Sequence, residues 1–354
     1  MSAALRPVSS AATSRPAGQD AIRPLRPRSA PKLALAGCGV VGGALVQLVA
    51  EGAIPGVRLA DVGAVLVRDP ARARDVPLDG SRFTADPMAL LDRRADVVVE
   101  ALPGVDPALT LARATLRRGA RYITANKRLI AEHGTELARL AERHGGQLDF
   151  EAAVGGAIPV VRAIRDGLAG VGVHTVRGVL NGTTNFVCSR ALRGDSVASA
   201  VAEAQALGYA EADPSRDLDG LDAADKLRLL AWLAFGIAPH QLPVTIGGFA
   251  DAATLLDAAR SEGRVVRQVA EIRRTSHGLS ASVTLQRLST DDPLASVDLE
   301  RNRVVVESRS AGTLVFEGPG AGGFATAGAL VADLLRPGRA LPRPTLVHVQ
   351  QTER

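Results

Sequence analysis

The sequence is poor in the residues that mark several classes of protein. Aromatic residues make up only 3% of the 354, and there are two cysteines, Cys38 and Cys188. So few rings argue against a stacking platform for single-stranded nucleic acid. Two cysteines without metal-type spacing exclude a disulfide framework, so we expect a reducing, cytoplasmic location and two small buried thiols.

Lysine is also scarce. Of the 42 basic residues, only Lys32, Lys127 and Lys226 are lysines. Arginine replaces lysine in most surface roles but cannot give up a proton at neutral pH. A lysine that remains in so arginine-rich a chain is therefore a candidate for proton chemistry.

The basic charge is concentrated at the N-terminus. Residues 1–31 contain five arginines and one acid, Asp20, whereas the whole chain carries a net charge of +5. We expect residues 1–31 to be a disordered basic tail, although the composition is also that of a transit peptide. The rest is close to neutral, so the basic pI does not indicate a nucleic-acid surface. A hydrophobic content of 46% predicts a globular protein of about two domains.

Residues 33–50 lack formal charge, and their length alone would allow a membrane helix. Glycines crowd the first half of this run, however, and each costs about 1 kcal/mol inside a helix. A strand at 32–36, the turn Gly37-Cys38-Gly39-Val40-Val41-Gly42 and a helix at 41–50 explain the run better. This G-x-G-x-x-G pattern is typical of dinucleotide-binding turns, although flavin and methyl-donor enzymes also use glycine turns. We expect a cofactor to contact Gly37, Gly39, Val40, Val41 and Gly42.

Strands and helices alternate after the glycine turn. Apolar strands are predicted at 63–67, 96–101 and 121–124, and helices at 87–93, 107–118 and 135–143. This alternation predicts an α/β fold with a doubly wound parallel sheet, the Rossmann type. The second strand is followed by Arg68-Asp69, of which the arginine favours NADP and the aspartate NAD. We expect NADP with Arg68 as a ligand, and NAD stays possible.

Three polar segments follow, each with two interpretations. Lys127 follows the C-terminal end of a strand, where ligands bind, and is either a ligand-binding residue or a surface lysine. Glu151 lies beside a glycine-rich bend and either holds a cation or caps a helix at 159–166. Residues 181–185, Asn-Gly-Thr-Thr-Asn, line a pocket or cap a helix at 186–192.

An acidic segment, 211–225, carries six carboxylates. A calcium loop aligned on Gly220 fails, because Ser215 and Lys226 would occupy its first and last ligand positions. From 221 to 235 the chain predicts a helix on which Asp222 and Lys226 are one turn apart and lead an apolar stripe. A partly buried Asp–Lys pair is costly without a function, and a proton donor to a developing alkoxide is one such function. Carboxylates such as Glu211 and Asp217 suggest a substrate with an ammonium group.

These residues together resemble the homoserine dehydrogenase family from residue 33 to about 335. Shorter blocks at 124–127, 151–158, 180–185 and 318–322 also resemble the family. The longest matching block has the fixed residues Ala204, Gly208, Tyr209, Ala210, Asp213, Pro214, Asp217, Leu218, Gly220, Asp222 and Lys226.

The resemblance implies reversible, NAD(P)-dependent interconversion of L-aspartate 4-semialdehyde and L-homoserine, on the route to threonine and methionine. It implies a nucleotide-binding domain at 32–150 completed by about 318–340, an α+β substrate and dimerisation domain at 151–317, and a C-terminal tail at 341–354. A homodimer through the sheet of the second domain is expected, with no membrane and no specific nucleic acid as a partner.

Residue roles follow from the same resemblance. Lys226 would exchange the proton at the carbonyl oxygen, and Lys127 would assist there and near the nicotinamide. Asp222 would belong to the catalytic set and hold substrate. The resemblance adds Glu211, Asp217 and Thr183 as substrate residues. It adds Pro103, Gly208 and Gly322 as cofactor residues. The ligands of a monovalent cation such as sodium would be Glu151, Val154, Gly156 and Ile158.

Three departures from the family pattern bear on these roles. Leu102-Pro103-Gly104 replaces a small polar or glycine turn, and Phe324-Ala325 stands where proline is common. The chain also ends about 20 residues after the core, so we expect no regulatory domain and no cooperative inhibition by threonine. The alternatives left open are a dinucleotide-sensing regulatory protein, for which no DNA-reading helix pair is found, and another amino-acid dehydrogenase.

Overall fold

A parallel sheet of six strands forms the first half of the chain, in the order β3-β2-β1-β4-β5-β6. The structure is a computed structural model that describes residues 31–92 and 95–336. The strand order is that of the doubly wound dinucleotide-binding fold, which confirms the expected fold class. The strands are β1 Leu33–Ala36, β2 Val62–Leu66, β3 Phe83–Thr84, β4 Val97–Glu100, β5 Arg121–Thr124 and β6 Gln147–Asp149.

The helices of this half differ from expectation in one place. Helix α4 was expected from 135 but begins at Lys127, because the side chain of Asn126 accepts a hydrogen bond from the N–H of Leu129 at 3.0 Å. Lys127 therefore sits in the first turn of a helix and not in a loop. The helices and short turns are α1 Val40–Ala50, η1 Leu59–Asp61, η2 Gly80–Arg82, α2 Ala89–Asp92, α3 Ala108–Arg117, α4 Lys127–His144 and η3 Glu151–Ala153.

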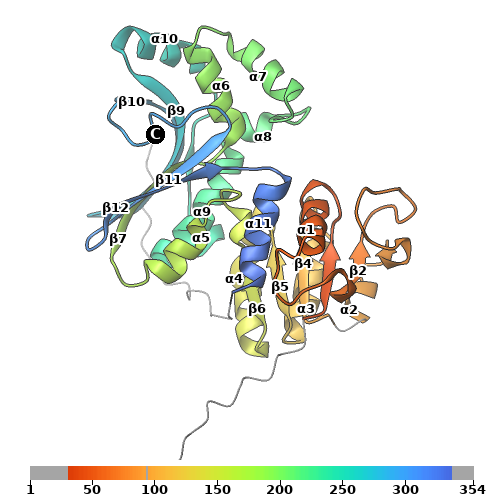
Figure 1. The fold of residues 1–354 in the computed structure, drawn as a ribbon. Coiled ribbons are helices and arrows are strands. Elements are labelled where there is room, and N and C mark those ends of the chain that lie inside the picture. The colour runs from red at the N-terminus through yellow and green to blue at the C-terminus, as the bar shows by residue number, and fades with distance from the viewer. Residues whose placement is uncertain (1–30, 93–94, 337–354) are drawn as a thin grey trace, which may run out of the picture. The chain divides into compact units, whose positions relative to one another are not determined.

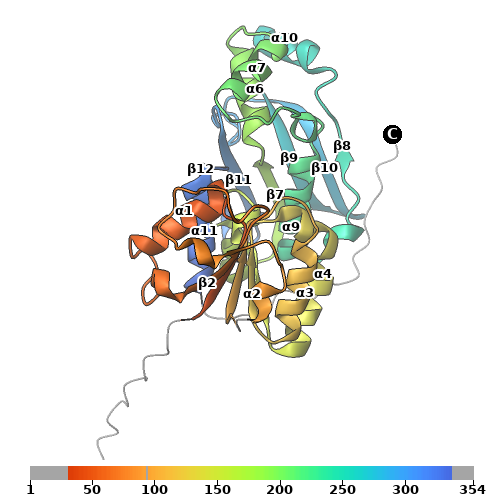
Figure 2. The same cartoon turned by 90° about the vertical axis from the view of Figure 1, so that its right-hand side faces the viewer.

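A second, mixed sheet follows, in the order β12-β11-β7-β9-β10-β8 (Figure 2). All neighbours in it are antiparallel except β8 and β10. Helices α6 and α9 both contact β9 and cover one face, where Ala270 and Ile272 are fully buried. The strands are β7 Val173–Val179, β8 Thr245–Ile246, β9 Val265–Thr275, β10 Gly278–Leu288, β11 Arg301–Ser308 and β12 Gly312–Pro319.

The remaining elements surround this sheet. Helix α9 spans the predicted 221–235, whereas α6 begins at Gly182, four residues before the expected start, because Asn181 caps it. The elements are α5 Val160–Arg162, η4 Ala163–Gly167, α6 Gly182–Leu192, α7 Val197–Ala206, α8 Ser215–Leu218, α9 Leu221–Phe235, η5 Pro239–Gln241, α10 Ala252–Glu262 and α11 Gly323–Leu334.

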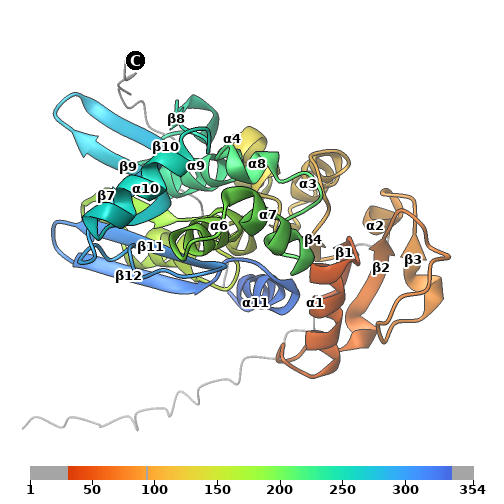
Figure 3. The same ribbon diagram turned by 90° about the horizontal axis from the view of Figure 1, so that it is seen from above.

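Helix α11 returns the chain to the first sheet. It packs against α1, and the two lie side by side in Figures 1 and 3. A Cβ added at Gly323 would lie 3.0 Å from the backbone oxygen of Val40, so the two helix starts are in close contact. Helix α11 therefore begins beside the glycine turn, within the segment 318–340 that was expected to complete the nucleotide-binding domain.

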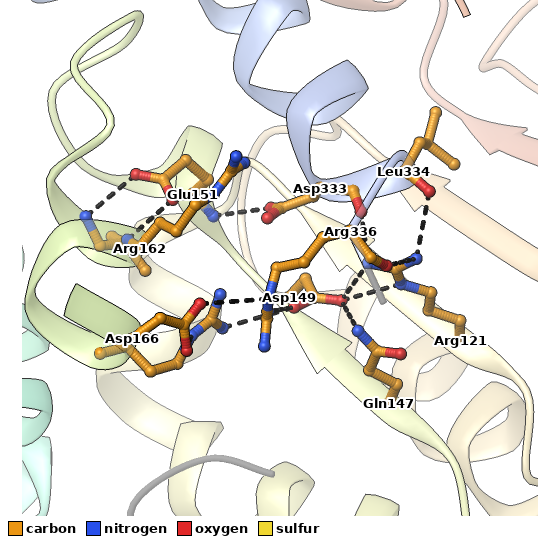
Figure 4. Close-up of polar contacts among 11 residues, drawn as sticks. Arg121, Gln147, Asp149, Glu151, Arg162, Asp166, Asp333, Leu334 and Arg336 are labelled. Carbon is orange, nitrogen blue, oxygen red and sulfur yellow. Dashed lines mark hydrogen bonds and ion pairs between the residues drawn. The ribbon is translucent and has the colours of Figure 1, made fainter. Parts of the chain in front are cut away.

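A buried cluster of charged side chains holds the end of α11 (Figure 4). Asp149 pairs with Arg121 at 2.7 Å, with Arg165 at 3.4 Å and with Arg336. Arg121 also donates to the carbonyl oxygens of Leu334 and Arg336. These bonds tie β5, β6 and the end of α11 together.

By their contacts, residues 31–92 and 95–336 belong to one compact unit. Within the described ranges, no helix is long and apolar enough to cross a membrane. The expected tails at 1–31 and 341–354 lie outside the described residues, apart from residue 31.

Candidate active site

The Asp222–Lys226 pair is buried in the structure. The two residues are 7% and 9% exposed, and the ammonium of Lys226 lies 2.7 Å from Oδ2 of Asp222. Leu229, Leu230 and Leu233 are buried with them, as the helical stripe predicts. Lys226 also donates to the carbonyl oxygen of Leu180 at 2.7 Å. Two of its three N–H groups are therefore used, which leaves one donor for a ligand.

Lys127 reaches the same carboxylate from the other half of the molecule. Its ammonium lies 2.9 Å from Oδ1 of Asp222, and its side chain is 37% exposed. One carboxylate thus holds the ammonium groups of Lys127 and Lys226, one on each oxygen. Two of the three lysines in the chain meet at one point.

Asn181 completes this cluster and caps α6, which is one of the two roles expected of its segment. Its Oδ1 accepts from the N–H of Thr184 and caps α6. Its Nδ2 donates to Asp222 at 2.9 Å and to Asp217 at 2.7 Å. Asp217 is therefore brought to the site through Asn181.

The charges of the two lysines govern the ionisation of Asp222. Burial raises the pKa of Asp222, but the ammonium groups of Lys226 and Lys127 outweigh burial and hold that pKa well below its usual range. In return, Asp222 raises the pKa of Lys127 against the opposing effect of burial. Asp222 is a carboxylate at any physiological pH, and Lys127 is an ammonium.

The glycine turn has the geometry that a dinucleotide requires. Gly37 has a φ of +99°, and a Cβ there would lie 2.6 Å from the carbonyl oxygen of Ala101. A Cβ on Gly42 would lie 2.0 Å from the carbonyl oxygen of Gly37. No heavy atom lies within 4 Å of a Cβ built on Gly39, so the backbone there is open to a pyrophosphate. Val40 is 79% exposed at the start of α1.

Of the further predicted cofactor residues, Gly322 and the turn at Pro103 lie beside the glycine turn. Gly322 is the N-cap of α11, next to the start of α1, and has a φ of +120°. Pro103 is exposed in the turn after β4. Gly208 is exposed beyond α7, where the carbonyl of the neighbouring Tyr209 accepts a hydrogen bond from Thr183 at 2.7 Å.

Arg68 is exposed directly after β2, as predicted, and a second arginine was missed there. Arg74 donates to the carbonyl oxygens of Asp69 and Arg72, and its guanidinium lies 4.9 Å from the ring centroid of Phe83. Its charge lowers the pKa of Cys38 in the glycine turn, although burial has the larger effect and raises it. Nothing in the spacing of Arg74 from the glycine turn could have indicated this proximity.

The carboxylate of Glu151 is fully buried and caps α5. Capping a helix was the second of the two roles expected for this residue. Its oxygens accept from the backbone N–H groups of Val161 and Arg162, both at 2.9 Å. The carbonyl oxygen of Ile158, another predicted cation ligand, accepts from the N–H of Val160 at 2.8 Å. Gly156 lies in the bend with a positive φ, as the chain reverses there.

Two predicted residues are not in contact with the lysine cluster. Glu211 is exposed, and its backbone carbonyl accepts from Gln205. Thr183 is buried at the start of α6, and its hydroxyl is bonded to Tyr209.

Glu100 and Asn302 are buried residues near the site that sequence analysis missed. Asn302 donates to the carbonyl oxygen of Leu180, the same oxygen that Lys226 uses. Glu100 ends β4 with no exposed surface. A single acid at the end of a strand that is otherwise valine was the available signal for Glu100; an asparagine in β11 carried none.

Comparison with known proteins agrees with this geometry. Residues 37–151 match the family described as homoserine dehydrogenase, NAD binding domain, and residues 159–335 match homoserine dehydrogenase. The chain belongs to the homoserine dehydrogenase family.

Relatives in this family are similar over most of their length. The homoserine dehydrogenase of Corynebacterium glutamicum is 38% identical over 324 residues, which cover 87% of this chain and 72% of that protein. The homoserine dehydrogenase of Pseudomonas aeruginosa is 36% identical over 316 residues, 88% of this chain and 73% of that protein.

Solved homoserine dehydrogenase structures share the fold. That from Thiobacillus denitrificans has a TM-score of 0.78 at 34% identity and covers 85% of this chain and 72% of that one. A hyperthermophilic archaeal homoserine dehydrogenase in complex with NADPH has a TM-score of 0.72 at 26% identity, and the match covers 87% of this chain and 99% of that one. This chain is accordingly a nicotinamide-dependent oxidoreductase that interconverts L-aspartate 4-semialdehyde and L-homoserine, and the regulatory alternative is not favoured.

Proposed function

We propose that Lys226 is the proton donor and acceptor at the substrate oxygen in the homoserine dehydrogenase reaction. The observation that carries this role is the single carboxylate of Asp222, which bridges the ammonium groups of Lys226 and Lys127. When a carbonyl is reduced, negative charge develops on its oxygen, and a positioned ammonium both stabilises that charge and supplies the proton. In the oxidation of homoserine, the hydroxyl proton passes back to Lys226.

The surrounding residues orient the reactants. Asp222 fixes the ammonium nitrogen atoms of Lys127 and Lys226. Lys127, whose side chain is 37% exposed, assists at the substrate oxygen from the nucleotide-binding half. Asp217 is held next to Asp222 by Asn181 and provides a carboxylate for the substrate ammonium. Glu211 and Thr183 are proposed to hold the rest of the substrate.

The open backbone at Gly39 fits a dinucleotide cofactor, which supplies or accepts the hydride when bound. We propose NADP as the preferred form, because the end of β2 is bonded to Gly37, Arg68 follows that strand, and Arg74 lies near Cys38 of the glycine turn. A 2′-phosphate would be bound at this place. The remaining contacts are assigned to Gly37, Val40, Val41, Gly42, Pro103, Lys127, Gly208 and Gly322.

A monovalent cation such as sodium is proposed at the bend from Glu151 to Ile158. The carboxylate oxygens of Glu151 each accept one N–H and keep a second lone pair, so the residues fit a hard cation that takes oxygen ligands. The carbonyl oxygens of Val154, Gly156 and Ile158 would complete its shell. The cation would hold the bend that packs against the turn at Pro319 and Gly320.

We also propose that the protein is a cytoplasmic homodimer. The face of the second sheet opposite α6 and α9 carries small polar residues on β10, including Ser280, Ser282 and Thr284. In the described part of the chain, no helix covers this face, and a second copy could pair with it. Two free thiols agree with a reducing compartment.

Oxidation of L-homoserine with NADP, followed at the nicotinamide absorbance, tests the proton-transfer role. Lys226→Ala should lower kcat by about 10³-fold, and Lys226→Arg should fail as well because arginine does not exchange the proton. Cofactor affinity, measured by fluorescence titration, should stay near the wild-type value. Lys32→Ala, which alters the exposed third lysine, is the matched control and should keep full activity. Wild-type kcat in the arginine variant would contradict the role.

A further inference from the structure

Glu100 is a buried carboxyl group that no described cation neutralises. It is the last residue of β4, has no exposed surface, and lies opposite Thr124, the last residue of β5. Two other buried acids, Asp222 and Asp149, are paired with lysine or arginine. A buried carboxyl without a counter-charge is costly to keep, which points to a specific structural task.

That task is visible in its hydrogen bonds. One oxygen of Glu100 accepts from the N–H of Leu102 at 2.5 Å, and the other accepts from the hydroxyl of Thr124 at 2.5 Å. The Thr124 hydroxyl oxygen in turn accepts from the N–H of Asn126 at 2.8 Å. The side chain of Asn126 donates back to the carbonyl oxygens of Leu102, at 3.4 Å, and Gly104.

These bonds close a ring that joins two turns. One turn, Leu102-Pro103-Gly104, contacts the glycine turn, since a Cβ on Gly37 would lie 3.3 Å from the Leu102 side chain. The other turn leads into α4, where Asn126 is the N-cap and Lys127 the first residue. Glu100 therefore sits between the cofactor turn and the lysine that reaches Asp222.

We propose that Glu100 is a positioning residue that fixes Lys127 and the Leu102–Gly104 turn relative to each other, and that its carboxylate form is the one that holds the active arrangement. The proposal rests on the proposed function of Lys127.

The protonation state matters because of the donors that surround the group. As a carboxylate, Glu100 accepts both bonds. Once protonated on the oxygen that faces Thr124, Glu100 donates to the Thr124 hydroxyl instead of accepting from it. The Thr124 oxygen already accepts from Asn126, and the Thr124 hydrogen then needs another acceptor in a buried site.

Burial raises the pKa of Glu100 to about 7, against the opposing effect of the hydrogen bonds from Thr124 and Leu102. The ionisable side chain of Tyr122 also lies near Glu100, and burial together with the charge of Glu100 raises the pKa of Tyr122 well above 10. The Tyr122 hydroxyl itself donates to the carbonyl oxygen of Ala108 at 3.1 Å.

The pH profile of kcat for homoserine oxidation tests the proposal. Wild-type kcat should rise through an inflection near pH 7, whereas Glu100→Gln should lack this inflection and resemble the wild-type enzyme at low pH. Thr124→Val, which removes the hydroxyl link, should lower kcat by about tenfold or more through misplacement of Lys127. Glu51→Gln is the control, because Glu51 is an exposed acid that lies outside the ring. That variant should keep the inflection.

Thermal unfolding gives a readout that does not depend on activity. Between pH 4.5 and about 7 the native protein retains a proton on Glu100 that the unfolded chain has lost, so stability falls as pH rises through this window. Glu100→Gln should therefore have a higher Tm than wild type at pH 8 and the same Tm at pH 5. Exposed Glu51→Gln should show no such difference.

Three results would overturn the inference: an inflection retained in Glu100→Gln, an inflection lost in Glu51→Gln, or wild-type kcat in Thr124→Val. None of them would affect the proposed function, which depends on wild-type turnover and on the Lys226 variants.

Discussion

Asp222 combines burial with a permanent negative charge. The free-energy cost of removing this carboxylate from water is offset, because its oxygens are bonded to two ammonium groups and to Asn181. The two lysines in turn come close together only because the carboxylate lies between them. The cluster is therefore interdependent, and removing one member leaves a buried charge without its partner.

The scarcity of lysine proved informative at this scale. Arginine replaces lysine almost everywhere, yet the two lysines found within motifs both contact Asp222. Arg68 could be predicted as an exposed residue after the second strand. Arg74 could not, because its place beside the glycine turn depends on how the segment after β2 folds back.

Arg68→Ala tests the selection of the cofactor. We expect kcat/KM for NADP to fall by about tenfold, the loss of one exposed charge-assisted contact to phosphate, while kcat/KM for NAD changes little. Initial rates with each cofactor measure both constants. Arg58→Ala, an exposed arginine before β2, is the control. An unchanged preference for NADP would remove Arg68 as the selecting residue.

At the scale of elements, caps decide where the helices begin. Sequence periodicity identified α9 at its observed bounds, because its apolar stripe runs from end to end. It missed the first two turns of α4, which follow the cap that Asn126 supplies. This matters for function, since Lys127 gains a fixed direction from its place in the first helical turn.

The contact between the glycine turn and α1 makes a paired prediction possible. Gly42→Ala places a Cβ 2.0 Å from the carbonyl oxygen of Gly37, so we expect it to cost about 1–3 kcal/mol of stability and to weaken cofactor binding. Gly43→Ala places its Cβ 3.6 Å from Val76, an ordinary contact, and should stabilise α1 by about 1 kcal/mol. Chemical denaturation and cofactor titration of both variants measure these effects. Equal behaviour of the two alanine variants would contradict the close packing at Gly42.

At the scale of the whole molecule, residues distant in sequence assemble the site. Lys127 comes from α4 of the first half and Lys226 from α9 of the second, and the chain then returns through α11 to lie against α1. The charged cluster around Asp149 anchors that return (Figure 4).

The proposed dimer is testable at this scale. On the face of the second sheet opposite α6, Ser282 lies beside Glu271, and Glu271 pairs with Arg177 at 3.2 Å. Multi-angle light scattering should give about twice the chain mass of 36.7 kDa for the wild type. Ser282→Arg adds a bulky charge to this face and should shift the protein toward monomer. Ser261→Arg, on exposed α10, should stay dimeric. A monomeric wild-type protein would contradict the proposal.

The sequence alone determined the parallel α/β fold, the glycine turn, helix α9 and the Asp222–Lys226 pair. These are local features, because strand alternation, turn chemistry and helical spacing each act within a few residues. Tertiary structure decided that Lys127 shares the carboxylate of Asp222, that Glu151 caps α5, and that Glu100 joins two turns. Such contacts bring together residues far apart along the chain, and the free energy that selects them comes from packing and desolvation, which no short-range pattern in the sequence encodes.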